Sequence, residues 1–147
     1  MKVILQKEVF DPGQIINEFQ CQLNNVGAVV NFTGIVRNNK ESNLKKLHIE
    51  HYPEMTRHSL EEVQLSSKKR WNLQDSLIIH RYGDLKINEP IMMVMTAAKH
   101  RHEAFNAAEF LMDYLKSRAP FWKKEITNDG SEWVLSTEDD ENSLNRW

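Results

Sequence analysis

The sequence has very little of several features that mark large classes of proteins. Among its 147 residues there is one cysteine, Cys21, so no disulfide can form within the chain. The longest apolar run, residues 91–98, is far shorter than the ~20 residues that a membrane-spanning helix needs. Only three consecutive apolar residues follow Lys2, too few for a signal peptide. These absences predict a cytoplasmic protein that does not bind a membrane.

Charge of one sign and the common catalytic motifs are also missing. The formal net charge is −2, which argues against nucleic acid as a partner. There is no glycine-rich phosphate loop, no G-x-S-x-G, no H-E-x-x-H and no C-x-x-C. The close histidine pairs His48/His51 and His100/His102 have no third ligand nearby in the sequence. We therefore expect no metal and no cofactor.

What is present is the composition of one ordinary globular domain. Hydrophobic residues make up 40% of the chain and charged residues 27%, and the length is typical of a single core. Residues 137–147 differ, because they contain four acids and one arginine. We predict a domain over residues 1–136 and an acidic tail, residues 137–147, that is solvated or disordered.

The order of the predicted elements favours a single-domain α+β fold with a mixed sheet and three main helices. Asp11-Pro12 is typical of a helix start, and Pro120 ends the third helix. Gly34 interrupts an alternating strand, which is expected where another group approaches the backbone closely. Strands come in pairs between helices, which argues against a doubly wound parallel sheet. The strands are predicted near residues 1–10, 27–37, 47–49, 76–82 and 90–98 and in a hairpin around 128–130, and the helices near 12–23, 54–70 and 102–118.

Basic residues recur beside apolar segments. Residues 99–102, Lys-His-Arg-His, stand where a buried strand meets the third helix, whose N-terminus favours an anion. Lys116 lies in the last turns of that helix with its stem partly buried, Lys123 follows among aromatic residues, and Arg37 ends a strand. Such groups suit a flat heterocycle that carries phosphate. Helix-dipole complementarity and ordinary core packing explain the same residues equally well.

Cys21 offers little for sulfur chemistry. It lies on the polar side of the first helix, so we expect it to be exposed. No cationic residue flanks it to favour the thiolate. If this protein handles sulfur, the sulfur must come from outside the chain.

Four segments together resemble the family of molybdopterin synthase large, catalytic subunits. They are residues 27–39, 49–56, 78–85 and 99–125, and the resemblance runs in order to Trp133. It implies an α/β hammerhead fold and a dimer of large subunits with one small subunit at each end, a heterotetramer. It also implies transfer of sulfur from the C-terminal Gly-Gly thiocarboxylate of a small ubiquitin-like partner. The acceptor is cyclic pyranopterin monophosphate, which becomes the dithiolene molybdopterin.

The resemblance also implies residue roles. Lys116 and Lys123 are the expected catalytic residues, and Lys116 is expected to have a lowered pKa because it is partly desolvated. His100 and Arg101 are expected to reach the pocket of a neighbouring subunit. Ile35 is apolar where some relatives are basic, and Ala98 stands where serine is expected. The expected substrate-binding set is Ile35, Val36, Arg37, His100, Arg101, Lys116, Lys123, Lys124 and Glu125.

Two other functions remain open. The chain could be a non-catalytic adaptor that binds a ubiquitin-like protein through a sheet edge or groove. It could instead be an enzyme acting on another phosphorylated heterocycle, such as a nucleotide. The charge of the acidic tail would also allow it to fold back over the basic pocket in the absence of a partner.

Overall fold

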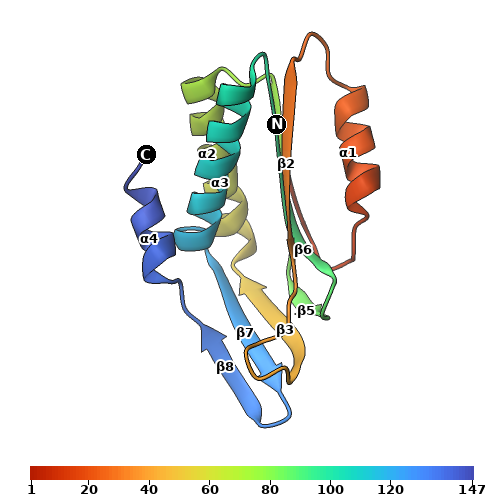
Figure 1. Ribbon diagram of the computed structural model, residues 1–147, viewed down its shortest axis with the longest axis vertical. Helices are drawn as coiled ribbons and strands as arrows, with labels where there is room; N and C mark the ends of the chain where they lie inside the picture. Colours follow the sequence, from red (N-terminus) through yellow and green to blue (C-terminus); the bar gives the residue numbers. More distant parts are fainter.

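The computed structural model describes all 147 residues and contains two four-stranded sheets (Figure 1). Sheet A is mixed, because β1 runs parallel to β4 while the other neighbours are antiparallel. Its strands in spatial order are β1 (Lys2–Gln6), β4 (Asp75–Arg81), β6 (Pro90–Ala98) and β2 (Ala28–Ile35). Sheet B is antiparallel, with the order β5 (Gly83–Leu85), β3 (Leu44–His51), β7 (Phe121–Thr127) and β8 (Gly130–Val134).

Helices cover both faces of sheet A (Figure 1). One helix packs on one face and two pack side by side on the other, while a short fourth helix lies against the third. None of the four is long and apolar enough to cross a membrane. They are α1 (Pro12–Cys21), α2 (Pro53–Trp71), α3 (Arg101–Ser117) and α4 (Glu138–Leu144).

Alternation along the central strands divides the interior into two layers. On β4, Ile78 points to the α2 and α3 side, whereas Leu77 and Ile79 point to the α1 side. Every residue of β4 after Asp75 is buried, as expected for a strand covered on both faces. Phe121 and Ile91 pack against both the α2–α3 layer and the core of sheet B, so they join the two sheets.

Local signals in the sequence placed most element boundaries correctly. The Asp11 carboxylate accepts hydrogen bonds from the backbone N–H groups of Gly13 and Gln14, which caps α1 as predicted. The α+β class and the three main helices are confirmed. Sheet A is the predicted mixed sheet, and the antiparallel sheet B is a second sheet that the sequence did not separate from it. The turn predicted after residue 82 also contains the short strand β5, which pairs with β3.

The glycine that makes a close backbone approach is Gly27 and not Gly34. A Cβ at Gly27 would lie 2.2 Å from the carbonyl oxygen of Lys99, so only glycine fits there. At Gly34 an added Cβ would make ordinary contact with the Met92 side chain at 3.4 Å. The interruption at Gly34 instead marks a β-bulge, since the pairing with β6 shifts register between Gly34 and Ile35.

The acidic tail contains a helix, so the prediction of disorder is wrong, whereas none of the helix is buried, as expected for a solvated segment. Thr137 and Asp140 form a capping box, in which each side chain accepts a hydrogen bond from the other residue's backbone N–H. The Ser117 hydroxyl donates to the Asp140 carbonyl, and the Trp147 indole N–H donates to Asp113 at 2.6 Å. Local capping and these contacts with α3 outweigh the repulsion among the acids. The division of the chain at residue 136 stays a prediction.

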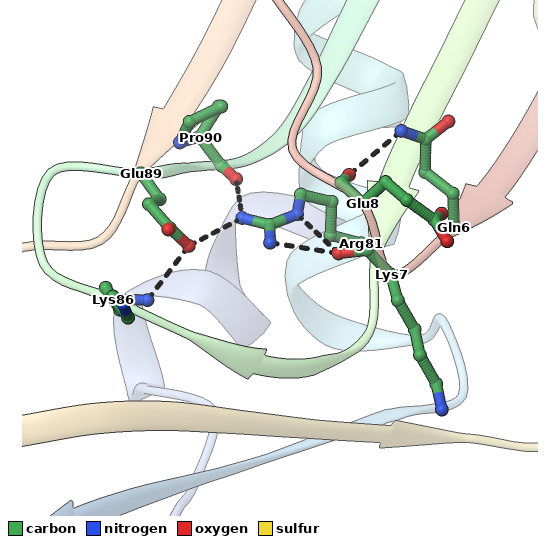
Figure 2. A network of polar contacts seen from close by, with 7 residues as sticks. All are labelled: Gln6, Lys7, Glu8, Arg81, Lys86, Glu89 and Pro90. Carbon is green, nitrogen blue, oxygen red and sulfur yellow. Dashed lines mark hydrogen bonds and ion pairs between the residues drawn. The ribbon is translucent and has the colours of Figure 1, made fainter.

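A buried arginine fixes the end of β4 (Figure 2). The Arg81 guanidinium donates to the carbonyl of Lys7 at 2.9 and 3.0 Å, to the carbonyl of Pro90 and to the carboxylate of Glu89. Glu89 also accepts from the backbone N–H of Lys86. The contacts of Arg81 are charge-assisted and therefore strong. They tie three chain segments together at the point where the chain passes from sheet A to sheet B.

Candidate active site

Lys123 lies on the inner face of sheet B. It is paired with Ile49 of β3 and Val134 of β8, and its side chain is half-buried. Side chains directly across neighbouring strands share a face, and Ile49 is in the core, so the Lys123 stem points the same way. Its ammonium forms no ion pair and no hydrogen bond within the chain. Lys123 is thus a cation held at the edge of the core without an internal partner.

The pKa of Lys123 is lowered to about 8. Burial is the main cause and the positive charge of Lys116 adds to it, while Asp140 of α4 acts in the opposite direction. An amine with this pKa exchanges its proton near neutral pH, which an ordinary lysine at roughly 10.4 does not. The burial acts through loss of hydration, which penalises the charged form of the amine. Lys123 therefore has the protonation behaviour of an acid–base group.

Lys116 is near Lys123, and as a whole residue it is exposed. Leu111 and Leu115 of α3 point into the core. Lys116 follows Leu115 by one position, a rotation of about 100° around the helix, which turns it towards solvent.

Two histidines near Lys123 were missed as site residues in the sequence. His80, at the end of β4, is only 2% exposed and stacks on Phe121 with ring centroids 3.7 Å apart. Burial lowers its pKa to about 3, with a further contribution from the charge of Lys123. His51 lies beside Tyr82 and Phe121. The available signal was a histidine at the end of a continuous apolar run, where a polar residue in a fully covered strand needs an explanation.

Arg37 and Glu125 share a polar hollow of about 790 Å³. Arg37 is exposed and comes from the loop after β2, whereas Glu125 lies on β7 two residues beyond Lys123 and so shares its face of sheet B. No hydrophobic residue lines this hollow, which makes it suitable for a charged, hydrated ligand. Its walls are Arg37, Asn38, Asn39, Lys40, Glu41, Glu125, Thr127, Asp129, Gly130, Ser131 and Glu132.

His100 and Arg101 lie far from the lysines within one chain. His100 is the N-cap of α3 and Arg101 its first residue, and both are exposed. Lys116 is fifteen residues along the same helix, which corresponds to about 22 Å at 1.5 Å per residue. Within a single chain these two residues therefore lie far from Lys116 and from Lys123 beside it.

The other expected substrate-binding residues have different surroundings. Ile35 is 56% exposed at the β-bulge. Val36 is buried, and its backbone N–H and carbonyl are hydrogen-bonded to Glu89 and Asn88, so its visible role is in the core. Lys124 points to the outer face of sheet B, where its ammonium lies 4.7 Å from the centre of the Trp133 ring. Binding by these residues stays a prediction.

Comparison with known proteins identifies relatives over the whole chain. A protein named molybdopterin synthase catalytic subunit from Cereibacter sphaeroides is 52% identical over 147 residues and covers 100% of both chains. One with the same name from Vibrio cholerae is 46% identical and covers 99% of this chain and 97% of its own. The solved structure of the molybdopterin biosynthesis MoaE protein from Burkholderia ambifaria superposes with a TM-score of 0.84 at 39% identity, covering 99% and 97% of the two chains.

A molybdopterin synthase structure from Staphylococcus aureus is more distant, with a TM-score of 0.81 and 31% identity over 90% of this chain and 96% of that one. The sequence model of the family described as MoaE protein matches residues 5–118, which include Arg37, Arg101 and Lys116, and Lys123 follows shortly after. Identity over the full length, the shared fold and this match agree. The chain belongs to the MoaE protein family.

Proposed function

We propose that this chain is the catalytic subunit of a molybdopterin synthase, a cytoplasmic sulfurtransferase of molybdenum cofactor biosynthesis. Its substrate would be cyclic pyranopterin monophosphate, and its sulfur donor the thiocarboxylate at the C-terminal Gly-Gly of a small ubiquitin-like subunit. The 52% identity to a named catalytic subunit over the full chain carries this proposal. The only thiol of the chain, Cys21, is exposed on α1, on the face of sheet A opposite to α2 and α3, which agrees with an external sulfur source.

The lysines would perform the proton and charge chemistry. Lys123, with its pKa lowered to about 8, can hold or release a proton at its ammonium as sulfur adds and the cyclic phosphate opens. Lys116 supplies a second positive charge nearby, which would stabilise developing oxyanions. Arg37 would bind the phosphate with its exposed guanidinium. The substrate would then lie along the inner face of sheet B.

A second copy of the chain would complete the site. Arg101 is about 22 Å along α3 from Lys116, so its proposed contact with substrate requires a neighbouring subunit. Edge strand β2 carries exposed apolar residues, with Phe32 44% and Ile35 56% exposed, and Phe105 on the adjacent helix α3 is 57% exposed. Such a surface favours a homodimer, which with one small subunit at each end gives the heterotetramer.

The test is to supply thiocarboxylated small subunit and pterin precursor and to identify the product by mass spectrometry. Dithiolene product from the wild-type chain, with a strong loss in Lys116→Ala, would support the proposal. Wild-type turnover by Lys116→Ala would contradict the assigned site. Partner binding without any turnover by the wild type, unchanged when both lysines are replaced, would instead identify an adaptor. A binding screen with nucleotides and pterins separates the remaining enzyme alternative.

A further inference from the structure

Three aromatic rings from three strands lie together beside Lys123. His51 ends β3, His80 lies near the end of β4 and Phe121 begins β7. The His80 and Phe121 rings are stacked, with planes 14° apart and centroids at 3.7 Å, and His51 lies 5.8 Å from Phe121. Phe121 and Lys123 are two positions apart on one strand, so they share a face. The ring wall, defined as His51, His80 and Phe121, therefore adjoins the lysine.

The hydrogen bond of His80 determines its tautomer, and burial keeps the ring uncharged. Its Nδ1 lies 2.8 Å from the carbonyl oxygen of Arg81. A carbonyl only accepts, so Nδ1 carries the proton and Nε2 of the neutral ring has none. The Arg81 side chain is itself fixed by the carbonyls of Lys7 and Pro90 and by Glu89 (Figure 2). With its pKa lowered to about 3 by burial, His80 stays neutral throughout the range in which the protein works.

His51 is tethered to the same place by a buried threonine. Its Nδ1 lies 3.2 Å from the hydroxyl oxygen of Thr56, and that hydroxyl donates to the carbonyl of Pro120 at 3.5 Å. Pro120 directly precedes Phe121, so the contact connects β3, α2 and the start of β7. Thr56 is completely buried, and burial also lowers the pKa of His51. Both imidazoles thus favour the uncharged form.

The titratable groups near Lys123 come from four other elements. Lys116 of α3 repels its charge, Asp140 of α4 attracts it, and His80 of β4 and His51 of β3 are neutral. The residues paired with it on sheet B are apolar, Ile49 and Val134. No carboxylate forms an ion pair with the ammonium. The protonation of Lys123 therefore depends mainly on how much water the surrounding side chains exclude.

We propose that His80 is a positioning residue for Lys123: its ring, stacked on Phe121 and fixed by the Arg81 carbonyl, excludes water from the inner side of the lysine. His51 has the same role from β3. A neutral ring beside the amine does not take its proton. It also does not stabilise the ammonium form, as a carboxylate would. The inference deepens the proposed function, since it explains how Lys123 becomes an acid–base group, and it rests on that function for its catalytic meaning.

The test measures the protonation of Lys123 directly in the full chain. Titration of ¹³C-labelled lysine by NMR, with Lys123 assigned from Lys123→Arg, is expected to give a pKa of about 8 for the wild type. His80→Gln, which loses the stacked ring and admits water, is expected to raise it by about one unit, and His80→Phe, which keeps a ring, by much less. His51→Gln is expected to give a smaller rise. In the wild type the His80 ring is expected to show no titration between pH 5 and 8.

His58→Gln is the matched control, because His58 is exposed on α2 and pairs only with Glu62. It is expected to leave the Lys123 titration unchanged. With thiocarboxylated small subunit, the pKa that governs kcat is expected to move in His80→Gln by the same amount as the NMR value, with KM nearly unchanged. A role limited to packing would lower stability without moving either pKa.

Three results would overturn the inference. They are a wild-type Lys123 that titrates near the ordinary value of roughly 10.4, a His80 that titrates near neutrality, and an unchanged Lys123 pKa in the folded glutamine variants. If His80→Gln does not fold, His51→Gln decides, since His51 is only half-buried. A lowered Lys123 pKa that responds to these variants, in a protein that makes no molybdopterin, would refute the proposed function and leave the role of the ring wall intact.

Discussion

Lys123 and Arg101 carry the same charge in opposite surroundings. Lys123 lies at the edge of the core beside three rings, and burial lowers its pKa to about 8. Arg101 is the exposed first residue of α3, and a guanidinium stays charged at every pH at which proteins fold. The comparison separates two tasks. In the proposed site, Lys123 would be suited to moving a proton and Arg101 to holding an anion.

The largest expected effect is on turnover, and it comes from the buried end. Lys123→Ala is expected to lower kcat by about 10²–10⁴-fold, because it would remove the proposed proton-transfer group. Lys123→Arg keeps the charge but cannot release a proton near neutral pH, so it is expected to be nearly as inactive. Steady-state assays of molybdopterin formation measure both variants. Recovery of most activity by Lys123→Arg would mean that charge alone is required there.

The next prediction concerns whether the two ends meet across a dimer. Lys123→Ala and Arg101→Ala chains, co-expressed with different tags and purified as mixed dimers, are expected to regain about half of the wild-type turnover. One of the two sites in such a dimer then has both residues intact, since each site takes Lys123 from one chain and Arg101 from the other. The two parent dimers, in which every site is damaged, serve as controls. If both residues acted within one chain, the mixed dimer would stay inactive.

A third prediction uses stability to compare the same two cations. The folded state binds the Lys123 proton less readily than the unfolded chain does, so stability is expected to rise with pH from about 8 to roughly 10.4. At pH 7 this desolvated charge is destabilising, and Lys123→Met is expected to raise the free energy of unfolding by about 1–3 kcal/mol. Arg101→Met, at an exposed position, is expected to change it by less than about 0.5 kcal/mol.

Urea unfolding at pH 7 and at pH 10 measures this difference. The gain from Lys123→Met should shrink at the higher pH, where the wild-type amine is neutral in the folded protein. A destabilised Lys123→Met protein would mean that the lysine stem contributes more through packing than its charge costs.

The smallest effect concerns the support beneath the buried end. Hydrogen bonds from the Lys86 backbone N–H and from Arg81 lower the pKa of Glu89. A carboxyl with a lowered folded pKa contributes stability above its unfolded value of about 4.3, and the contribution is lost as pH falls through the folded pKa. Glu89→Gln is therefore expected to be less stable than the wild type by under about 1 kcal/mol at pH 7. This difference is expected to shrink as the pH falls, because the wild-type carboxylate becomes protonated. Identical acid sensitivity of the two proteins in urea titrations would contradict this.

The sequence anticipated the local parts of the fold well. Asp11 and Pro12 mark the start of α1, and α3 ends before Pro120, because capping and the restrictions of proline act within a few residues. The capping box of α4 was equally local, yet the acidic composition concealed it. The separation into two sheets was beyond the local pattern, because strand alternation indicates which face is buried without identifying the neighbouring strand.

The sequence alone determined the residue types of this protein's site and the helices and strands that carry them. It did not determine which lysine loses its water. Lys116 and Lys123 are seven residues apart and both stand near aromatic residues, but only one faces the core of sheet B. Desolvation depends on neighbours from β3, β4 and α3 that are distant in the chain, so the tertiary structure decided the pKa of Lys123 and brought His80 beside it.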